Sequence, residues 1–263
     1  MLDKTRYDGQ DITIYPNKAI LTTPKGTREK EINITLKEIR DQLIKIGNNC
    51  PYWHDNYSQF YSSAVEKYGL PYMNYVYYFL FFQQLKVPTF QEFFDMYVYL
   101  YCDVLPNGLY TVKNYFDPSD FCFTKEALMG RIYRSYNSFH RELEFLFQFK
   151  EYDDISIWYD FQDDLNGIDF TVIYKGVHFG LATYIASENS YQWKQRKNNV
   201  RHDYSNLNII DIVAKFKKED PDFNCVSRNG IFTYSPKFVA KKYFEIIKAA
   251  EKILNVWKNS LSM

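Results

Sequence analysis

The chain has 263 residues, of which 46% are hydrophobic and 24% charged, a composition typical of a folded domain with ample core material. Its 32 basic and 32 acidic residues cancel. This balance excludes a protein that binds nucleic acid through an overall basic excess, so contact with a polyanion must depend on a local patch.

Two further features bear on the compartment. The first nine residues contain no apolar stretch of the kind found in a secretory signal, and the run 72–85 is too short and too polar to span a bilayer. The four cysteines are widely spaced and form no C-x-x-C pair, which predicts reduced thiols. We therefore expect a cytoplasmic protein with no membrane partner.

The first 123 residues are predicted to be mainly helical. Residues 11–23 contain short β-like runs broken by Pro16 and Asn17, which predicts a small hairpin or arm. Thr89 is followed three residues later by Glu92, the pattern of a capping box at the start of a helix. Helical spacing of apolar residues, or long aromatic runs, predict helices at 35–46, 57–68, 72–85 and 89–104.

Residues 124–263 are predicted to form an α/β core that makes one compact body with the helical part. A long helix is expected over 124–150, with Thr124 as its N-cap. The pattern then changes to strands around a turn at Lys175 and Gly176. The expected elements are strands at 155–159, 170–174 and 178–186, a helix at 187–199, a strand or short helix at 208–216, a strand at 231–234 and a helix at 238–257.

Acidic residues gather before the strand at 170–174. Asp169 stands in Gly167-Ile168-Asp169 at the start of that strand, where its carboxylate would project from an accessible end of the sheet. Such a carboxylate suits Mg²⁺, which prefers oxygen ligands and keeps several waters. The simpler interpretation of the preceding aspartates is a solvated acidic loop. They are Asp153, Asp154, Asp160, Asp163 and Asp164.

Two sets of basic residues are candidate phosphate contacts. Spacings of i, i+4, i+7 and i+11 predict a common helical face for Ser190, Lys194, Lys197 and Arg201, and a face of this kind can neutralise phosphates. On the helix over 124–150, Arg134 and Arg141 share a face, although an exposed amphipathic helix is the simpler account. A solvated basic face is likewise the simpler account of the first set.

Four features in chain order resemble a known family: Glu142 on a helix, Gly167-Ile168-Asp169 opening a hairpin, a second strand and a basic helix. They resemble the PD-(D/E)xK restriction-endonuclease-like core over roughly residues 140–202. That family combines a helix Glu, a strand Asp and a Glu/Gln-x-Lys on the next strand. The second strand here, 180–187, lacks the last motif, and Gln192-Trp193-Lys194 carries it instead.

The resemblance implies a mixed sheet flanked by helices, Mg²⁺ or Mn²⁺ dependence and hydrolysis of phosphodiester bonds. Asp169 and Glu142, or Glu144 in its place, would bind the metal, and Lys194 or Lys197 would stabilise charge that develops on the phosphate. The residues expected to contact nucleic acid are Arg196, Arg201, His202, Ser190 and Arg134.

Three functions are open at this point. The first is a Mg²⁺-dependent DNA endonuclease of restriction or phage-defence type. The second is a non-catalytic nucleic-acid-binding or scaffold protein on a decayed nuclease core, which the degenerate motif favours. The third is an interaction protein that presents its aromatic helices to a partner. The resemblance also implies a homodimer as the working form.

Overall fold

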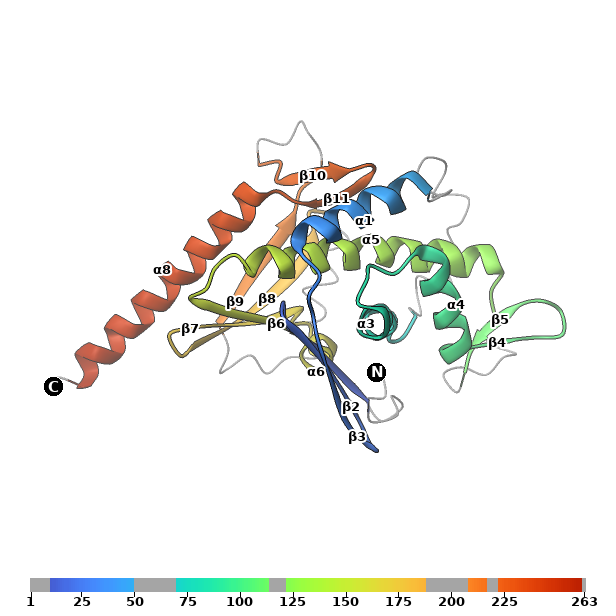
Figure 1. The fold of residues 1–263 in the computed structure, drawn as a ribbon, viewed down its shortest axis with the longest axis horizontal. Coiled ribbons are helices and arrows are strands. Elements are labelled where there is room, and N and C mark those ends of the chain that lie inside the picture. Colours follow the sequence, from blue (N-terminus) through green and yellow to red (C-terminus); the bar gives the residue numbers. More distant parts are fainter. Residues whose placement is uncertain (1–9, 50–69, 114–121, 188–207, 217–221, 262–263) are drawn as a thin grey trace.

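The structure is a computed structural model that describes residues 10–49, 70–113, 122–187, 208–216 and 222–261. Its centre is a mixed sheet of seven strands, so the predicted α/β class is confirmed (Figure 1). These strands are β1 (Asp11–Ile14), β2 (Lys18–Thr23), β3 (Gly26–Glu31), β6 (Ile155–Asp160), β7 (Phe170–Tyr174), β8 (Val177–Ile185) and β9 (Asn208–Ala214). Their order across the sheet is β3-β2-β1-β6-β7-β8-β9.

Helices and two small hairpins complete the described part of the chain. The helices are α1 (Leu36–Asn49), α3 (Met73–Gln84), α4 (Phe90–Tyr101), α5 (Lys125–Phe149), α6 (Phe161–Leu165) and α8 (Pro236–Leu261). The hairpins pair β4 (Cys102–Val104) with β5 (Tyr110–Val112), and β10 (Cys225–Arg228) with β11 (Ile231–Tyr234). Within the described ranges, no helix is both long enough and apolar enough to cross a membrane.

The second half of the sheet begins as an antiparallel meander and ends with a parallel pair. β6 pairs with β7 and β7 with β8 in antiparallel register, whereas β9 lies parallel to β8. The predicted turn between β7 and β8 is confirmed, with φ of 47° at Lys175 and 81° at Gly176. Positive φ at both positions matches the right-handed twist of a tight hairpin, and glycine adopts it without strain.

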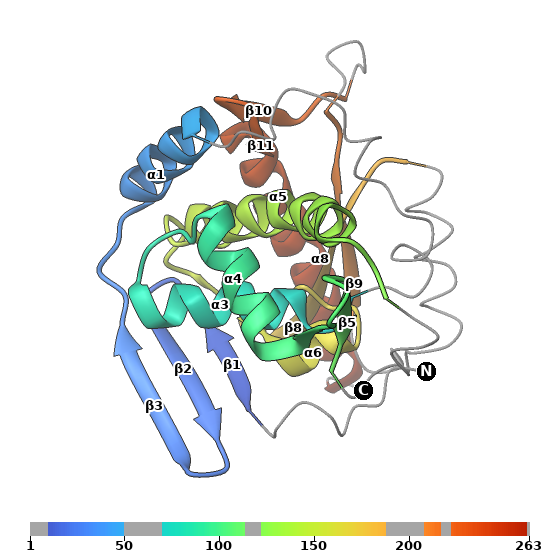
Figure 2. The ribbon, with the colours of Figure 1, turned by 90° about the vertical axis from the view of Figure 1, so that its right-hand side faces the viewer.

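The N-terminal strands extend this sheet rather than forming a separate arm. β1 pairs antiparallel with β6, placing Thr13 opposite Asp160, and the Thr13 hydroxyl donates to the Asp160 carboxylate over 2.9 Å. β2 and β3 then continue the sheet outward from β1 (Figure 2). The sheet therefore crosses the boundary predicted between residues 123 and 124.

The long helix α5 lies at the centre of the fold, where it contacts the sheet, α3 and α4, and α3 also packs directly against β1 and β2 (Figures 1 and 2). Phe145 packs against Phe170 of β7, with ring centroids 5.6 Å apart. On the other side, Phe93 of α4 stacks on Tyr136 with centroids 5.8 Å apart. Aromatic side chains supply much of this contact because each buries a large area in a defined geometry.

The burial of α5 corrects one interpretation of the sequence and several boundaries. His140 and Arg141 are buried, so the expected exposed basic face of this helix is wrong. The helix expected over 89–104 ends at Tyr101 and continues as β4. Residues 208–216 contain a strand, β9, rather than a short helix. The helices expected at 57–68 and 187–199 lie outside the described residues.

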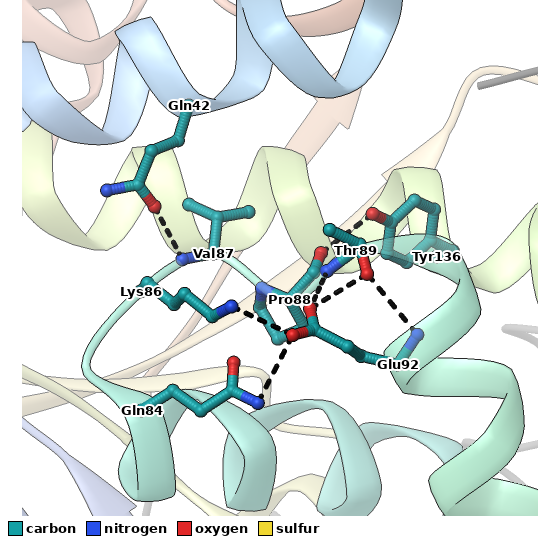
Figure 3. Close-up of polar contacts among 8 residues, drawn as sticks. All are labelled: Gln42, Gln84, Lys86, Val87, Pro88, Thr89, Glu92 and Tyr136. Atoms are coloured by element: carbon teal, nitrogen blue, oxygen red, sulfur yellow. Dashed lines mark hydrogen bonds and ion pairs between the residues drawn. The ribbon is translucent and has the colours of Figure 1, made fainter. Parts of the chain in front are cut away.

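The start of α4 shows how the helical layer is held together (Figure 3). The predicted capping box is confirmed: the Thr89 hydroxyl accepts from the Glu92 backbone N–H, and the Glu92 carboxylate accepts from the Thr89 N–H. Just before it, the Pro88 carbonyl accepts a 2.7 Å hydrogen bond from the Tyr136 hydroxyl of α5. Gln42 of α1 accepts from the Val87 N–H over 2.7 Å. One short segment therefore joins three helices.

Replacing Thr89 with alanine removes the side-chain half of this cap. We expect Thr89→Ala to lower the free energy of unfolding by about 1 kcal/mol, because one backbone N–H of the first turn of α4 loses its acceptor. Urea denaturation of the two proteins measures the difference. Thr89→Ser keeps the hydroxyl and should stay near wild type, and an equal loss in both variants would contradict the role of the cap.

Asp11, at the start of β1 near the middle of the sheet, provides a second test. Partial burial, followed by the charges of Asp160 and then Asp163, raises the pKa of Asp11 to about 6. A carboxyl group with a raised pKa in the folded state costs stability above that pKa, and this cost disappears below the unfolded value near 4. Asp11→Asn should therefore raise the melting temperature at pH 8 and leave it unchanged at pH 3.5.

Thermal unfolding of both proteins across this pH range checks the expectation. Asparagine keeps an oxygen for the Ile12 N–H, which bonds the Asp11 carboxylate over 2.8 Å, so the comparison isolates the charge. A constant difference in melting temperature at every pH would show that the effect is steric.

Candidate functional site

Glu142 lies on the buried side of α5, where it faces the sheet. Its side chain is held from two sides. The Ser138 hydroxyl, one turn earlier on the same helix, donates to Oε1 over 2.9 Å, and the Thr183 hydroxyl of β8 donates to the same oxygen over 3.1 Å. The residue is only 8% exposed. The Glu142 carboxylate is therefore largely removed from water and is hydrogen-bonded by two neutral hydroxyl groups.

Asp169 reaches the same point of the sheet from the loop before β7. Its backbone N–H donates to the Leu181 carbonyl over 2.9 Å, which fixes it beside β8. Its carboxylate accepts a short hydrogen bond from the Thr183 backbone N–H. Thr183 therefore contacts both carboxylates, Asp169 through its main chain and Glu142 through its side chain. The structure brings together the two residues expected to bind metal.

The two carboxylates influence each other electrostatically. Burial raises the pKa of Glu142 to about 8, and the next largest cause is the negative charge of Asp169. The Arg141 guanidinium and the hydrogen bonds from Ser138 and Thr183 oppose this rise. Two acidic groups that are costly to ionise together mark a position where a bound cation would be stabilised.

Glu144, the alternative metal ligand, has a different role. It lies two residues beyond Glu142 and so points roughly 200° away around the helix. Its carboxylate is fully buried between two arginines: Arg40 of α1 contacts Oε1 at 2.6 Å, and Arg228 of β10 contacts the same oxygen at 2.9 Å. This ion triad joins α1, α5 and β10. Of the two candidates, Glu142 is the one at the Asp169 site.

Arg141 places a positive charge next to Ser138, which contacts Glu142. Its Nη2 donates to the Ser138 hydroxyl over 3.1 Å, and that hydroxyl in turn donates to Glu142. The guanidinium is buried, with its carbon 4.9 Å from the ring centroid of Phe216. Ser138 thus connects a buried cation with a buried carboxylate. No sequence pattern predicts this chain of hydrogen bonds, because the spacing of Ser138, Arg141 and Glu142 is ordinary for a helix.

The other predicted site residues are not brought to this point by the described structure. Arg134 is half-buried on α5, eight residues and so roughly 12 Å before Glu142 along the helix. The strand β8 carries no lysine, as its sequence indicated. The remaining predicted residues lie outside the described part of the chain: Ser190, Lys194, Arg196, Lys197, Arg201 and His202.

The two carboxylates are ligands of the kind that Mg²⁺ prefers, but they do not by themselves complete its coordination. No group of three or more His, Cys, Asp and Glu side chains arranged for a metal occurs among the described residues. Mg²⁺ is commonly bound through one or two carboxylates and keeps several waters, so a pair is sufficient. Glu142 and Asp169 therefore fit a hydrated divalent cation.

Comparisons with models of protein families, with curated proteins and with solved structures give no match to this chain. The geometry of the site is therefore the basis for assigning a function.

The two glutamates of α5 can be distinguished by their effects on stability. Glu144→Gln should lower the free energy of unfolding by about 3 kcal/mol, because it leaves Arg40 and Arg228 without their shared carboxylate. Glu142→Gln should leave stability unchanged or raise it, since the amide oxygen keeps both donors and a costly buried charge is removed. Urea denaturation at pH 8 in the presence of EDTA measures both.

The comparison has a clear negative outcome. If Glu142→Gln loses as much stability as Glu144→Gln, then Glu142 is a structural ion-pair partner like its neighbour, and the pair with Asp169 is not a cation site.

Proposed function

We propose that this protein is a divalent-cation-dependent endonuclease that hydrolyses phosphodiester bonds of DNA on a restriction-endonuclease-like core. The observation that carries the proposal is the convergence of Glu142 and Asp169 on Thr183. These carboxylates come from a helix and from the start of a strand, 27 positions apart (169 − 142). Two acids from separate elements, meeting at one end of a sheet, are typical of a metal-assisted hydrolase.

The arrangement of elements supports the same proposal. The helix α5 with its glutamate is followed by the meander β6–β7–β8, and β9 then pairs parallel to β8. The aspartate stands at the start of the second strand of the meander, as the PD-(D/E)xK pattern requires. Described helices pack against a mixed sheet, which is the setting that the resemblance implies.

Within this proposal each residue has a defined task. Glu142 and Asp169 would hold Mg²⁺ or Mn²⁺, and the bound cation supplies a Lewis acid that polarises the phosphate and lowers the pKa of water. Thr183 orients both carboxylates through its hydroxyl and its N–H. Ser138 holds the Glu142 carboxylate from the other side and connects it to the charge of Arg141. These contacts fix the ligands before DNA arrives.

The positive charge that the family carries on its third strand must come from elsewhere in this chain. β8 ends at Ile185, and Lys194 and Lys197 follow nine and twelve positions later in the sequence. They remain the proposed source of charge beside the phosphate. Arg196, Arg201, His202, Ser190 and Arg134 remain the proposed DNA contacts, and a second copy of the chain remains the proposed partner in a dimer.

A non-catalytic DNA-binding protein on the same core is the second candidate. The observation in its favour is that β8 offers no charged side chain beside the two carboxylates, since the position facing Glu142 is Thr183 and the next residue on that face is Ile185. A core that has lost its strand cation can still bind a duplex through other basic groups.

Cleavage of supercoiled plasmid by the purified protein tests the proposal. We expect cutting with Mg²⁺ or Mn²⁺, none with EDTA, and a loss of roughly 100-fold or more in Asp169→Asn, which removes a charge from the cation site but keeps an acceptor for Thr183. Asp103→Asn, an exposed aspartate in β4, is the matched control and should cut like wild type.

The alternative outcomes separate the two candidates. A wild-type protein that shifts duplex DNA in a gel without cutting it, under either cation, would support the binding protein and overturn the endonuclease. A protein that neither cuts nor binds DNA would overturn both.

A further inference from the structure

Tyr78 of α3 has a buried hydroxyl group without a hydrogen-bond partner among the described residues. The residue is 0% exposed, so water from the bulk does not reach it. Its neighbour Tyr77 is equally buried, but the Tyr77 hydroxyl is satisfied by Nδ1 of His140 at 2.7 Å. Buried hydroxyls are nearly always paired, because losing water without gaining a partner is costly. The Tyr78 hydroxyl therefore calls for an explanation.

Tyr78 packs near the acidic side chains around the start of β7. Its ring stacks on Tyr159 of β6, with centroids 3.8 Å apart and an interplanar angle of 26°. The Tyr159 hydroxyl donates to Asp164 over 3.1 Å. Burial is the main reason that the pKa of Tyr78 lies well above its usual value, and the charges of Glu142, Asp164 and Asp169 raise it further. Tyr159 follows Trp158, which pairs with Thr171 of β7, so the Tyr78 ring lies beside the start of β7, where Asp169 stands.

Other buried groups do not share this combination. His140 also has a ring nitrogen, Nε2, without a described partner, but its surroundings are the aromatic rings of Tyr77 and Tyr136. Asp11, Asp160 and Asp163 form an acidic group where β1 begins and β6 ends, but Asp160 and Asp163 already accept hydrogen bonds from the Thr13 and Thr171 hydroxyls. Tyr78 combines an unused hydroxyl with two carboxylates suited to a cation.

We propose that the Tyr78 hydroxyl is an outer-shell partner of a divalent cation at Glu142 and Asp169, forming a hydrogen bond with a water molecule that the cation carries. Mg²⁺ and Mn²⁺ bound by two carboxylates retain waters, and a cation makes its waters strong hydrogen-bond donors. A phenol oxygen accepts such a bond, and the dry aromatic walls around Tyr78 strengthen it. This inference rests on the cation site of the proposed function, and it does not depend on DNA cleavage.

The two adjacent tyrosines make a matched experiment. Mn²⁺ is titrated into wild type, Tyr78→Phe and Tyr77→Phe by calorimetry, and the melting temperature of each is measured in EDTA and in Mn²⁺. Loss of an outer-shell partner typically weakens a metal site by roughly 10- to 100-fold. We expect this loss in Tyr78→Phe, together with a melting temperature in EDTA equal to or above that of wild type.

Tyr77→Phe should show the opposite pattern. Because it strips His140 of its partner, its melting temperature should fall by the same amount with and without Mn²⁺, while its affinity for Mn²⁺ stays at the wild-type value. Asp169→Asn should abolish the Mn²⁺ binding, which locates the titrated site.

Three results would overturn the inference. Equal Mn²⁺ affinity in wild type and Tyr78→Phe would remove the role of the hydroxyl and leave the endonuclease standing if plasmid is still cut. A lower melting temperature of Tyr78→Phe in EDTA would show that the hydroxyl has a structural task. A wild type that binds no Mn²⁺ would remove the cation site itself, and the plasmid assay reports separately whether the protein cuts DNA.

Discussion

Helix α5 buries charged side chains at the centre of the fold, and each buried charge must be compensated. Glu144 meets this requirement with Arg40 and Arg228, so an ion triad joins α1, α5 and the β10–β11 hairpin. Glu142, on the opposite side of the same helix, accepts hydrogen bonds from two hydroxyls, lies near a second acid, and is reached by the charge of Arg141 through Ser138 rather than by a direct ion pair of the kind that Glu144 makes. One helix thus carries a carboxylate in a direct ion triad that holds the fold together and a second carboxylate, still costly to ionise, that is suited to a ligand.

The sheet places the Glu142 carboxylate where it can act. β7 begins and the parallel pair β8–β9 ends close to Glu142, so main-chain groups at strand ends contact the site. Thr183 contributes both a backbone N–H and a hydroxyl, and it therefore sets the separation of the two acids. Large aromatic side chains of α3, Tyr77 and Tyr78 among them, are fully buried on the α5 side of this region. In such surroundings electrostatic interactions are stronger than at a solvated surface.

Local sequence patterns predicted the elements that depend on neighbours in the chain. The long helix at 124–150, the hairpin around Gly176 and the capping box at Thr89 were all expected, because each has a periodic or positional signature within a few residues. The pairing of β1 with β6 was not predicted, since its partners are 147 positions apart. Short strands such as β4 and β10 also lack a signature of their own.

The candidate site was predictable in its two acids but not in their environment. The order of Glu142 and Asp169 along the chain resembled a known pattern, whereas nothing local separated Glu142 from Glu144 as a ligand. That choice follows from which side of α5 faces the arginines, and packing decides it. Tyr78 stands in a run of aromatic residues that all look like core material. Whether a buried hydroxyl has a hydrogen-bond partner depends on the tertiary packing around it, so the sequence does not predict it.

The pairing of β1 with β6 also constrains the order in which the protein forms during synthesis. β1 and β2 are made before β6, their partner strand, which ends at Asp160. Until β6 has been made, β1 has an open edge with unsatisfied backbone groups. Closing so long a loop is slow, because the chain loses conformational entropy before the contacts between the distant strands can form. The β1–β2–β3 group forms locally but keeps one unpaired edge until β6 is made, and this edge is where wrong pairing is most easily started.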